Sequence, residues 1–169
     1  MGYGMSLITR AEETTVETKA PGSLTLRVPD EARILIVCEN DADTERLRTV
    51  FREAGFISEC AQSMTAGCES AKSGRFQVVF TAPLLSDGSW RRLIDVANHF
   101  DLDFEVVLLA RTFDLNQWAE ALKDGAFDVL DYLYDLPRAA ETLKSALWAA
   151  YLKGAGLRPE AASPRRRLD

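Results

Sequence analysis

The chain has 169 residues, of which 47% are hydrophobic, and this size and composition suit one globular domain with tails. Its formal net charge of -6 and its pI near 4.9 disfavour binding to nucleic acid or to an acidic membrane, because either partner requires a basic footprint. No apolar run reaches the length of a signal peptide core or a membrane-spanning helix, so we expect neither secretion nor membrane insertion.

The three cysteines, Cys38, Cys60 and Cys68, show neither CxxC spacing nor Cys/His ligand spacing. Their odd number argues against a closed disulfide framework. These features favour a reducing, cytoplasmic location and predict no metal site and no cofactor.

The two ends of the chain differ in composition from its middle. Residues 1–30 are rich in Thr, Glu and Gly and predict a flexible arm, although the alternation of apolar and polar residues at 24–28 leaves a short edge strand open. Residues 154–169 carry two prolines and a run of three arginines that is too short for a nucleic-acid footprint, and they indicate a second tail. We therefore predict one domain over residues 31–153.

Between the tails, short apolar runs alternate with amphipathic segments. Residues 34–37 form a continuous apolar run of the kind that a buried parallel strand requires, and apolar residues then recur at helical spacing until Gly55. Repetition of this unit predicts five strands, at residues 34–37, 57–61, 77–81, 106–109 and 127–132.

Five predicted helices follow the strands, the second between Ser63 and Gly74 and the last from about Pro137 to Ala150. Five strands alternating with five helices imply right-handed crossovers and a parallel sheet covered on both faces, the flavodoxin-like doubly wound (βα)5 arrangement, a three-layer α/β sandwich. The residues predicted to face inward are Trp90, Leu93, Ile94 and Ala97 in the third helix and Leu115, Trp118, Ala119 and Leu122 in the fourth.

Four blocks of sequence, at residues 33–40, 47–56, 85–90 and 125–130, resemble the receiver domain of bacterial two-component response regulators. The resemblance extends over residues 33–152. It implies phosphoryl transfer from a histidine kinase to an aspartate at the end of the third strand, with Mg²⁺ held by that aspartate and by an acidic pair after the first strand. It also implies a hydroxyl after the fourth strand and a lysine after the fifth, both of which hold the phosphoryl oxygens.

In this sequence the acidic pair falls on Cys38 and Glu39, the phosphoacceptor on Ala82, the hydroxyl on Ala110 and the lysine on Tyr132. Only Glu39 keeps the chemistry that the resemblance implies. The losses are coupled, because clustered carboxylates need a neutralising cation and a lysine without its carboxylates is an unpaired charge. We therefore expect a degenerate phosphorylation pocket that is mostly neutral, packed, and covered by the ring of Tyr132.

Other polar residues near this pocket have simpler interpretations. The cluster at residues 40–43 suits a helix N-cap and the helix dipole better than a divalent-ion site. Asp87 is interpreted as a residue of the turn and cap that start the third helix, not as a displaced phosphoacceptor. His99, the only histidine, is interpreted as a surface or helix-terminal residue.

We predict an atypical, phosphorylation-independent receiver that is not an enzyme and acts as a protein-interaction module in bacterial signalling. Tyr134, Trp148 and Tyr151, together with Tyr132, are candidates for an exposed aromatic patch, since interfaces favour Tyr and Trp. In the receiver family the face built from the fourth helix, fifth strand and fifth helix mediates dimers and output contacts. The resemblance thus implies protein partners, including a second copy of the chain.

Two alternatives stay open. A thiol-based redox switch centred on Cys38 requires a reactive thiol at the end of the first strand. An enzyme or nucleotide-binding protein that reuses the same crevice has less support, because the sequence has no Gly-rich phosphate loop and no nucleophile elbow.

Overall fold

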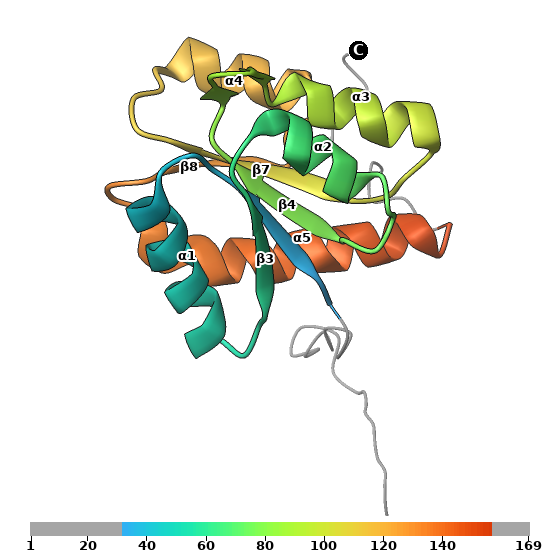
Figure 1. Cartoon of the computed structure of the whole chain (residues 1–169), viewed down its shortest axis with the longest axis horizontal. Helices are drawn as coiled ribbons and strands as arrows, with labels where there is room; N and C mark the ends of the chain where they lie inside the picture. The colour runs from blue at the N-terminus through green and yellow to red at the C-terminus, as the bar shows by residue number, and fades with distance from the viewer. Residues whose placement is uncertain (1–31, 157–169) are drawn as a thin grey trace, which may run out of the picture.

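The computed structural model describes residues 32–156, so the predicted arm at 1–30, its edge strand at 24–28 and most of the tail at 154–169 lie outside the described residues. Within this range a five-stranded parallel sheet has the order β3-β2-β4-β7-β8. Helices cover both faces of this sheet (Figure 1). The predicted flavodoxin-like fold is therefore confirmed.

The strands are β2 (Ile34–Val37), β3 (Ser58–Ala61), β4 (Val78–Thr81), β7 (Glu105–Ala110) and β8 (Asp128–Asp131), and the helices are α1 (Asp41–Glu53), α2 (Met64–Ala71), α3 (Arg91–Phe100), α4 (Leu115–Lys123) and α5 (Ala139–Gly154). All five strands lie within two residues of their predicted positions. A short 3₁₀ helix (Leu136–Arg138) contains Pro137, so that α5 begins two residues later than the predicted start.

Two hydrophobic cores lie on opposite faces of the sheet, because successive strand residues point to opposite sides. Ile34 and Ile36 of β2 pack with residues of α1 and α5, whereas Leu35 and Val37 pack with residues of α2 and α3. Figure 1 shows the same division, with α1 and α5 on one face and α2, α3 and α4 on the other. A strand that is buried on both faces must be apolar throughout, which explains the continuous apolar run in β2.

The inward face of α3 is confirmed, since Trp90 is 2% exposed and Leu93 is fully buried. The prediction for α4 is wrong. Leu115 is 77% exposed, Trp118 is 40% exposed, and Ala121 is the one residue of α4 that is buried. Ala119, which was also predicted to face inward, is exposed, and Leu122 is half-buried.

The β4–α3 connection contains a feature that the sequence did not predict. Leu84–Leu85 (β5) and Gly88–Ser89 (β6) form a small antiparallel pair, and Asp87 lies in the turn between them. Strands of two residues are too short to show a hydrophobic period. This turn places Asp87 and Ser86 beside the carboxyl ends of the strands.

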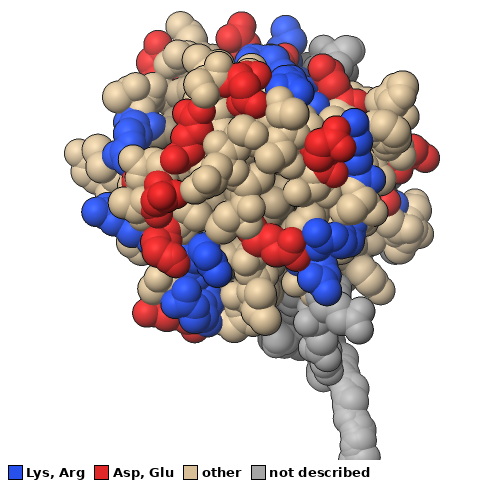
Figure 2. Space-filling view, in the orientation of Figure 1, with Lys and Arg blue, Asp and Glu red and all other residues tan. Residues whose placement is uncertain are grey.

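On the face of the molecule shown in Figure 2, acidic and basic side chains are intermixed around a broad uncharged area. None of the helices within residues 32–156 is long and apolar enough to cross a membrane.

Candidate functional site

Four strand ends meet at the carboxyl edge of the sheet and form the candidate site. The backbone N–H of Ala82 donates to the carbonyl of Val37 (3.2 Å), and that of Tyr132 donates to the carbonyl of Ala110 (2.8 Å). The N–H of Cys38 donates to the carbonyl of Ala61 (3.0 Å). These bonds continue the parallel ladders past the strand ends, so the residues that follow β2, β4 and β8 lie close together at one edge.

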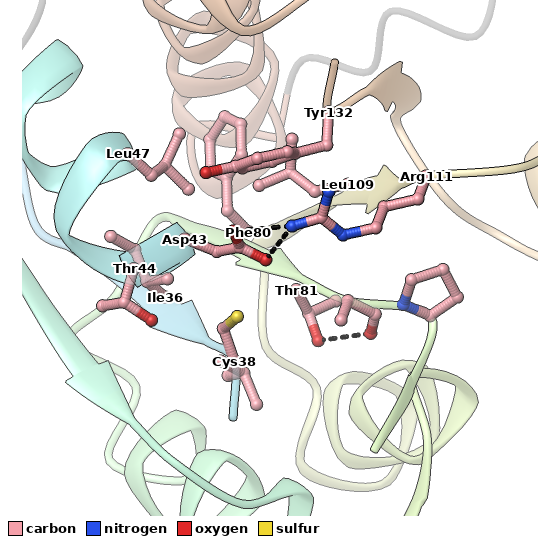
Figure 3. Close-up of a pocket in the computed structure, with 13 residues that line it drawn as sticks. Ile36, Cys38, Asp43, Thr44, Leu47, Phe80, Thr81, Leu109, Arg111 and Tyr132 are labelled. Atoms are coloured by element: carbon pink, nitrogen blue, oxygen red, sulfur yellow. Dashed lines mark hydrogen bonds and ion pairs between the residues drawn. The ribbon is translucent and has the colours of Figure 1, made fainter. Parts of the chain in front are cut away.

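A cavity of about 220 Å³ opens between these strand ends and α1 (Figure 3). Its walls are mainly apolar, while Ala82 contributes only a methyl group and the backbone. Thr81 offers a hydroxyl, but this hydroxyl already donates to the carbonyl of Ala82 (2.8 Å). The apolar residues that line the cavity are Ile36, Val37, Leu47, Phe80, Pro83 and Leu109.

An ion pair that the sequence analysis missed lies at this cavity. The Arg111 guanidinium donates to both carboxylate oxygens of Asp43, at 2.7 and 2.6 Å. These hydrogen bonds raise the pKa of Arg111. Asp43 was assigned only a role in the first turn of α1, and 68 positions separate it from Arg111, so no local pattern connects them. The expectation of a mostly neutral, packed pocket is thus corrected, since the pocket contains a cavity of about 220 Å³ and holds two charges that neutralise each other.

The ring of Tyr132 covers the cavity. The Arg111 guanidinium stacks over this ring, 4.6 Å from its centroid, and Figure 3 shows the ring lying across the cavity with its hydroxyl toward Leu47. Tyr132 is 4% exposed, so its inclusion in an exposed aromatic patch is wrong. Its buried hydroxyl has no hydrogen-bond partner in the part of the chain that the structure describes. Burial raises the pKa of the Tyr132 phenol, and the nearby Asp43 carboxylate raises it further.

Glu39 and Cys38, at the predicted acidic-pair positions, are engaged in local contacts. The Glu39 carboxylate accepts from the backbone N–H of Ser86 (2.9 Å) and from the Ser86 hydroxyl. The Cys38 thiol is half-buried and donates to the carbonyl of Asn40 at 3.6 Å. All three cysteines, the other two being Cys60 and Cys68, are free in the described structure, and the Cys38 redox switch stays a prediction.

Asn40 caps α1 as predicted, because its side chain accepts from the backbone N–H of Asp43 (2.9 Å). Asp87 caps a different helix from the one predicted. Its carboxylate accepts from the backbone N–H groups of Met64 and Thr65, both at 2.8 Å, which lie in the first turn of α2. These bonds lower the pKa of Asp87 to about 2. His99 is exposed near the end of α3, as predicted.

A second hollow, which we call the α4–β8 groove, lies between α4 and the end of β8. It has a volume of about 310 Å³ and is lined by Phe113, Leu115, Trp118 and Val129, with an acidic rim of Asp114, Asp131 and Asp135. Leu133 and Tyr134, which are 60% and 79% exposed, lie in the turn between Asp131 and Asp135. This surface contains the apolar residues of α4 that were predicted to be in the core.

The turn that carries Tyr134 is well ordered by hydrogen bonds. The Asp131 carboxylate accepts from the backbone N–H groups of Leu133 (2.8 Å) and Tyr134 (3.2 Å), and the Asp135 carboxylate accepts from the N–H of Asp131 (2.9 Å). Arg138 in turn donates to Asp135 (2.9 Å). The exposed ring of Tyr134 is therefore presented on a fixed backbone.

The three residues predicted to form an aromatic interface do not form one cluster. Trp148 and Tyr151 stack on each other at 5.6 Å near the C-terminal end of α5, whereas Tyr134 precedes its N-terminal end. A helix of 16 residues is about 24 Å long. Tyr134 thus lies beside the rim of the α4–β8 groove, in the turn between Asp131 and Asp135, and the Trp148–Tyr151 pair is a separate feature.

Within residues 32–156, no group of three or more His, Cys, Asp or Glu side chains is arranged to hold a metal ion.

No family model and no curated protein matches this sequence. Solved structures do match it. The signal receiver domain of a putative LuxO repressor from Vibrio parahaemolyticus is 15% identical with a TM-score of 0.68, and the alignment covers 74% of this chain and 96% of that one. A response regulator receiver domain protein from Clostridium thermocellum is 19% identical, with a TM-score of 0.63 and coverage of 72% and 98%. The receiver domain of the putative response regulator NarL from Mycobacterium tuberculosis is 14% identical, with a TM-score of 0.63 and coverage of 70% and 98%. At these identities the likeness shows that the chain has the receiver fold.

Proposed function

We propose that residues 31–153 form an atypical receiver domain that acts in signal transduction by binding other proteins, without aspartyl phosphorylation and without catalysis. The observation that carries this proposal is the residue at the end of the central strand. Ala82 directly follows β4, level with the end of β2, where receivers carry the phosphoacceptor according to the sequence resemblance. A methyl group offers neither a nucleophile nor a metal ligand.

The neighbouring carboxylates do not replace the missing aspartate. Magnesium requires several oxygen ligands in near-octahedral array. The Asp43 carboxylate is already bonded through both oxygens to Arg111, and one oxygen of Glu39 is bonded to Ser86. A cation that enters the site would have to displace Arg111 and would gain few ligands in return.

The α4–β8 groove is the surface that we assign to partner binding. Trp118 and Leu115 expose large apolar side chains in the groove, and Tyr134 exposes its ring in the turn between the rim residues Asp131 and Asp135. Trp and Tyr are among the residue types that often supply most of the binding energy of an interface. The ordered turn reduces the entropy that Tyr134 loses when it binds. The acidic rim favours a partner with an apolar centre and basic flanks.

The first experiment tests phosphorylation directly. The full chain is incubated with acetyl phosphate or phosphoramidate, with and without Mg²⁺, and its intact mass is measured beside that of a conventional receiver domain. We expect the conventional receiver to gain one phosphoryl group and this chain to gain none. Stoichiometric, Mg²⁺-dependent phosphorylation of this chain would refute the proposal.

The second experiment tests the groove. Partners captured from the source cell, and self-association measured by sedimentation equilibrium, are compared for Trp118→Ala, Tyr134→Ala and the control Ile57→Ala. Ile57 is 84% exposed beside β3, at the opposite edge of the sheet. We expect a loss of affinity of about tenfold or more in the two groove variants, as for interface hot spots, and none in the control. Equal effects in all three variants would exclude the groove as the docking surface.

A further inference from the structure

The cavity beneath Tyr132 has the properties of a binding site that no part of the proposed function uses. Its apolar walls come from β2, β4, β7 and α1, which belong to the rigid core of the domain. For comparison, an engineered apolar cavity of about 150 Å³ in another protein takes up benzene. At about 220 Å³, this cavity has room for a ring system of one or two fused rings.

The Tyr132 hydroxyl is the second and independent observation. It is buried, and no residue in the range 32–156 meets it in hydrogen-bond geometry, although Asp43 and Arg46 lie near enough to shift its pKa. Buried polar groups are nearly always hydrogen-bonded, and a hydroxyl without a partner carries a desolvation penalty. A ligand in the cavity that offers one donor or acceptor to this oxygen would remove the penalty.

The charges around the cavity indicate that the ligand is uncharged. Arg111 and Asp43 neutralise each other through two short hydrogen bonds, and Glu39 is bonded to Ser86 outside the cavity lining. Arg46 acts on the Tyr132 hydroxyl from outside the cavity lining. A charged ligand would therefore lose its hydration without gaining a free counterion in the cavity wall. A neutral ligand loses little hydration and gains contacts with the apolar walls.

We propose that this cavity binds a small, uncharged, mainly apolar molecule of one or two rings, whose single polar group forms a hydrogen bond with the Tyr132 hydroxyl. This proposal does not depend on the α4–β8 groove or on the outcome of the phosphorylation assay. The molecule would lie between α1 and the end of β7, in contact with the central strands β2 and β4 through Ile36 and Phe80.

Indole and indene are suitable probes, because they have nearly the same shape and only indole carries an N–H. Each is titrated into the ¹⁵N-labelled full chain and followed by heteronuclear NMR. We expect saturable shifts of the residues around Ala82, Leu47 and Leu109 with both probes. Indole should bind about two- to tenfold more tightly than indene, as one additional hydrogen bond predicts.

Two variants test the assigned contacts. Tyr132→Phe removes only the hydroxyl and should abolish the preference for indole while indene still binds. Ala82→Leu places a larger side chain at the cavity and should abolish the binding of both probes, and Ile57→Ala serves as a distant control. The spectrum of each variant also reports whether it is folded.

Three results would overturn the proposal. The first is the absence of saturable shifts with either probe at millimolar concentration, which would mean that the cavity holds at most ordered water. The second is a preference for indole that persists in Tyr132→Phe. The third is a set of shifts confined to the α4–β8 groove that Ala82→Leu leaves unchanged. Because Tyr132→Phe alters a single atom, the test remains decisive if Ala82→Leu fails to fold.

Discussion

A buried ion pair between Glu105 and Lys153 joins the start of β7 to the last turn of α5. The side chains of Glu105 and Lys153 are 5% and 14% exposed, and the Lys153 Nζ lies 3.0 Å from the Glu105 Oε2. Within residues 32–156 that oxygen has no partner in hydrogen-bond geometry, so the contact with Lys153 is mainly an attraction between two charges and not a directional hydrogen bond. Lys153 is therefore the group that compensates the buried carboxylate.

Substitution of Lys153 by Met removes this charge and keeps most of the side-chain volume. At 3.0 Å and an effective dielectric constant of about 20, two unit charges attract by about 5 kcal/mol. Loss of one partner from a buried pair costs about 3–5 kcal/mol, because the other charge stays buried without compensation. Since domains of this size are stable by about 5–15 kcal/mol, Lys153→Met should remove a large fraction of the free energy of unfolding.

The assay is equilibrium unfolding in urea, followed by tryptophan fluorescence and far-UV circular dichroism. The double variant Glu105→Met/Lys153→Met should recover most of the stability, because it leaves no unpaired charge. Lys72→Met is a matched control, since Lys72 pairs with Glu69 at the same 3.0 Å but the two side chains are 40% and 67% exposed. This control should lose less than about 1 kcal/mol.

Two results would refute this reasoning. A loss of less than about 1 kcal/mol in Lys153→Met would show that the carboxylate is solvated or otherwise compensated. A double variant as unstable as Lys153→Met would show that the lysine stabilises the fold through its packing and not through its charge.

The remaining predictions concern the cap of α2, the packing of α2, the buried Trp90 and the exposed Trp118. The pKa of Asp87 is about 2 in the folded protein, below its ordinary value of 3.8. The ionised carboxylate therefore stabilises the folded protein above about pH 4, and this contribution is lost as the pH falls toward 2. Thermal unfolding should show Asp87→Ala less stable than the parent at pH 6 and nearly equal to it at pH 2. Gly67→Ala would bring a Cβ to 2.7 Å from a methyl of Val37. Urea unfolding should show that overpacking lowers the free energy of unfolding by about 1–3 kcal/mol, in spite of the better helix propensity of Ala. A higher free energy of unfolding would contradict this packing. Trp90→Ala should cost about 3–5 kcal/mol in the same assay and Trp118→Ala less than about 1 kcal/mol, whereas similar losses would place Trp118 in the core.

The layout of the sheet could be predicted from the sequence because its central strands are buried on both faces. Residues 34–37 and 106–109 are apolar at every position, and runs of this length suit a strand buried on both faces and are too short for a buried helix. The starts of α1 and α2 could be predicted too, since Asn40 and Ser63 are residue types that favour N-caps and both accept from backbone N–H groups three residues ahead.

The orientation of α4 could not be predicted in the same way. Leu115 and Trp118 recur at helical spacing, which correctly indicates an apolar stripe, but periodicity does not show whether the stripe faces the sheet or the solvent. In the structure the small residue Ala121 packs against the sheet and the large residues lie outward. This apolar stripe has no partner among residues 32–156, and its residues Leu115 and Trp118 line the α4–β8 groove.

The interior of the candidate site depends on contacts between distant parts of the chain. The assignment of Cys38, Ala82, Ala110 and Tyr132 to a degenerate phosphorylation pocket needs only a comparison of single positions with the receiver pattern, and it stays a prediction. The pairing of Asp43 with Arg111 could not be found in this way, because each residue has a sufficient local explanation as a helix or surface residue. Only the fold brings the start of α1 and the end of β7 together.

The Asp43–Arg111 ion pair also determines how a molecule reaches the cavity. The Arg111 side chain is 51% exposed and that of Asp43 is 18% exposed. Exposed ion pairs contribute little to stability and are weakened by salt, whereas the ring of Tyr132 is buried and its displacement would disturb the core. We therefore expect Arg111 to move aside more easily than the strands or Tyr132. Access to the cavity by this route would be a local side-chain motion that higher ionic strength favours.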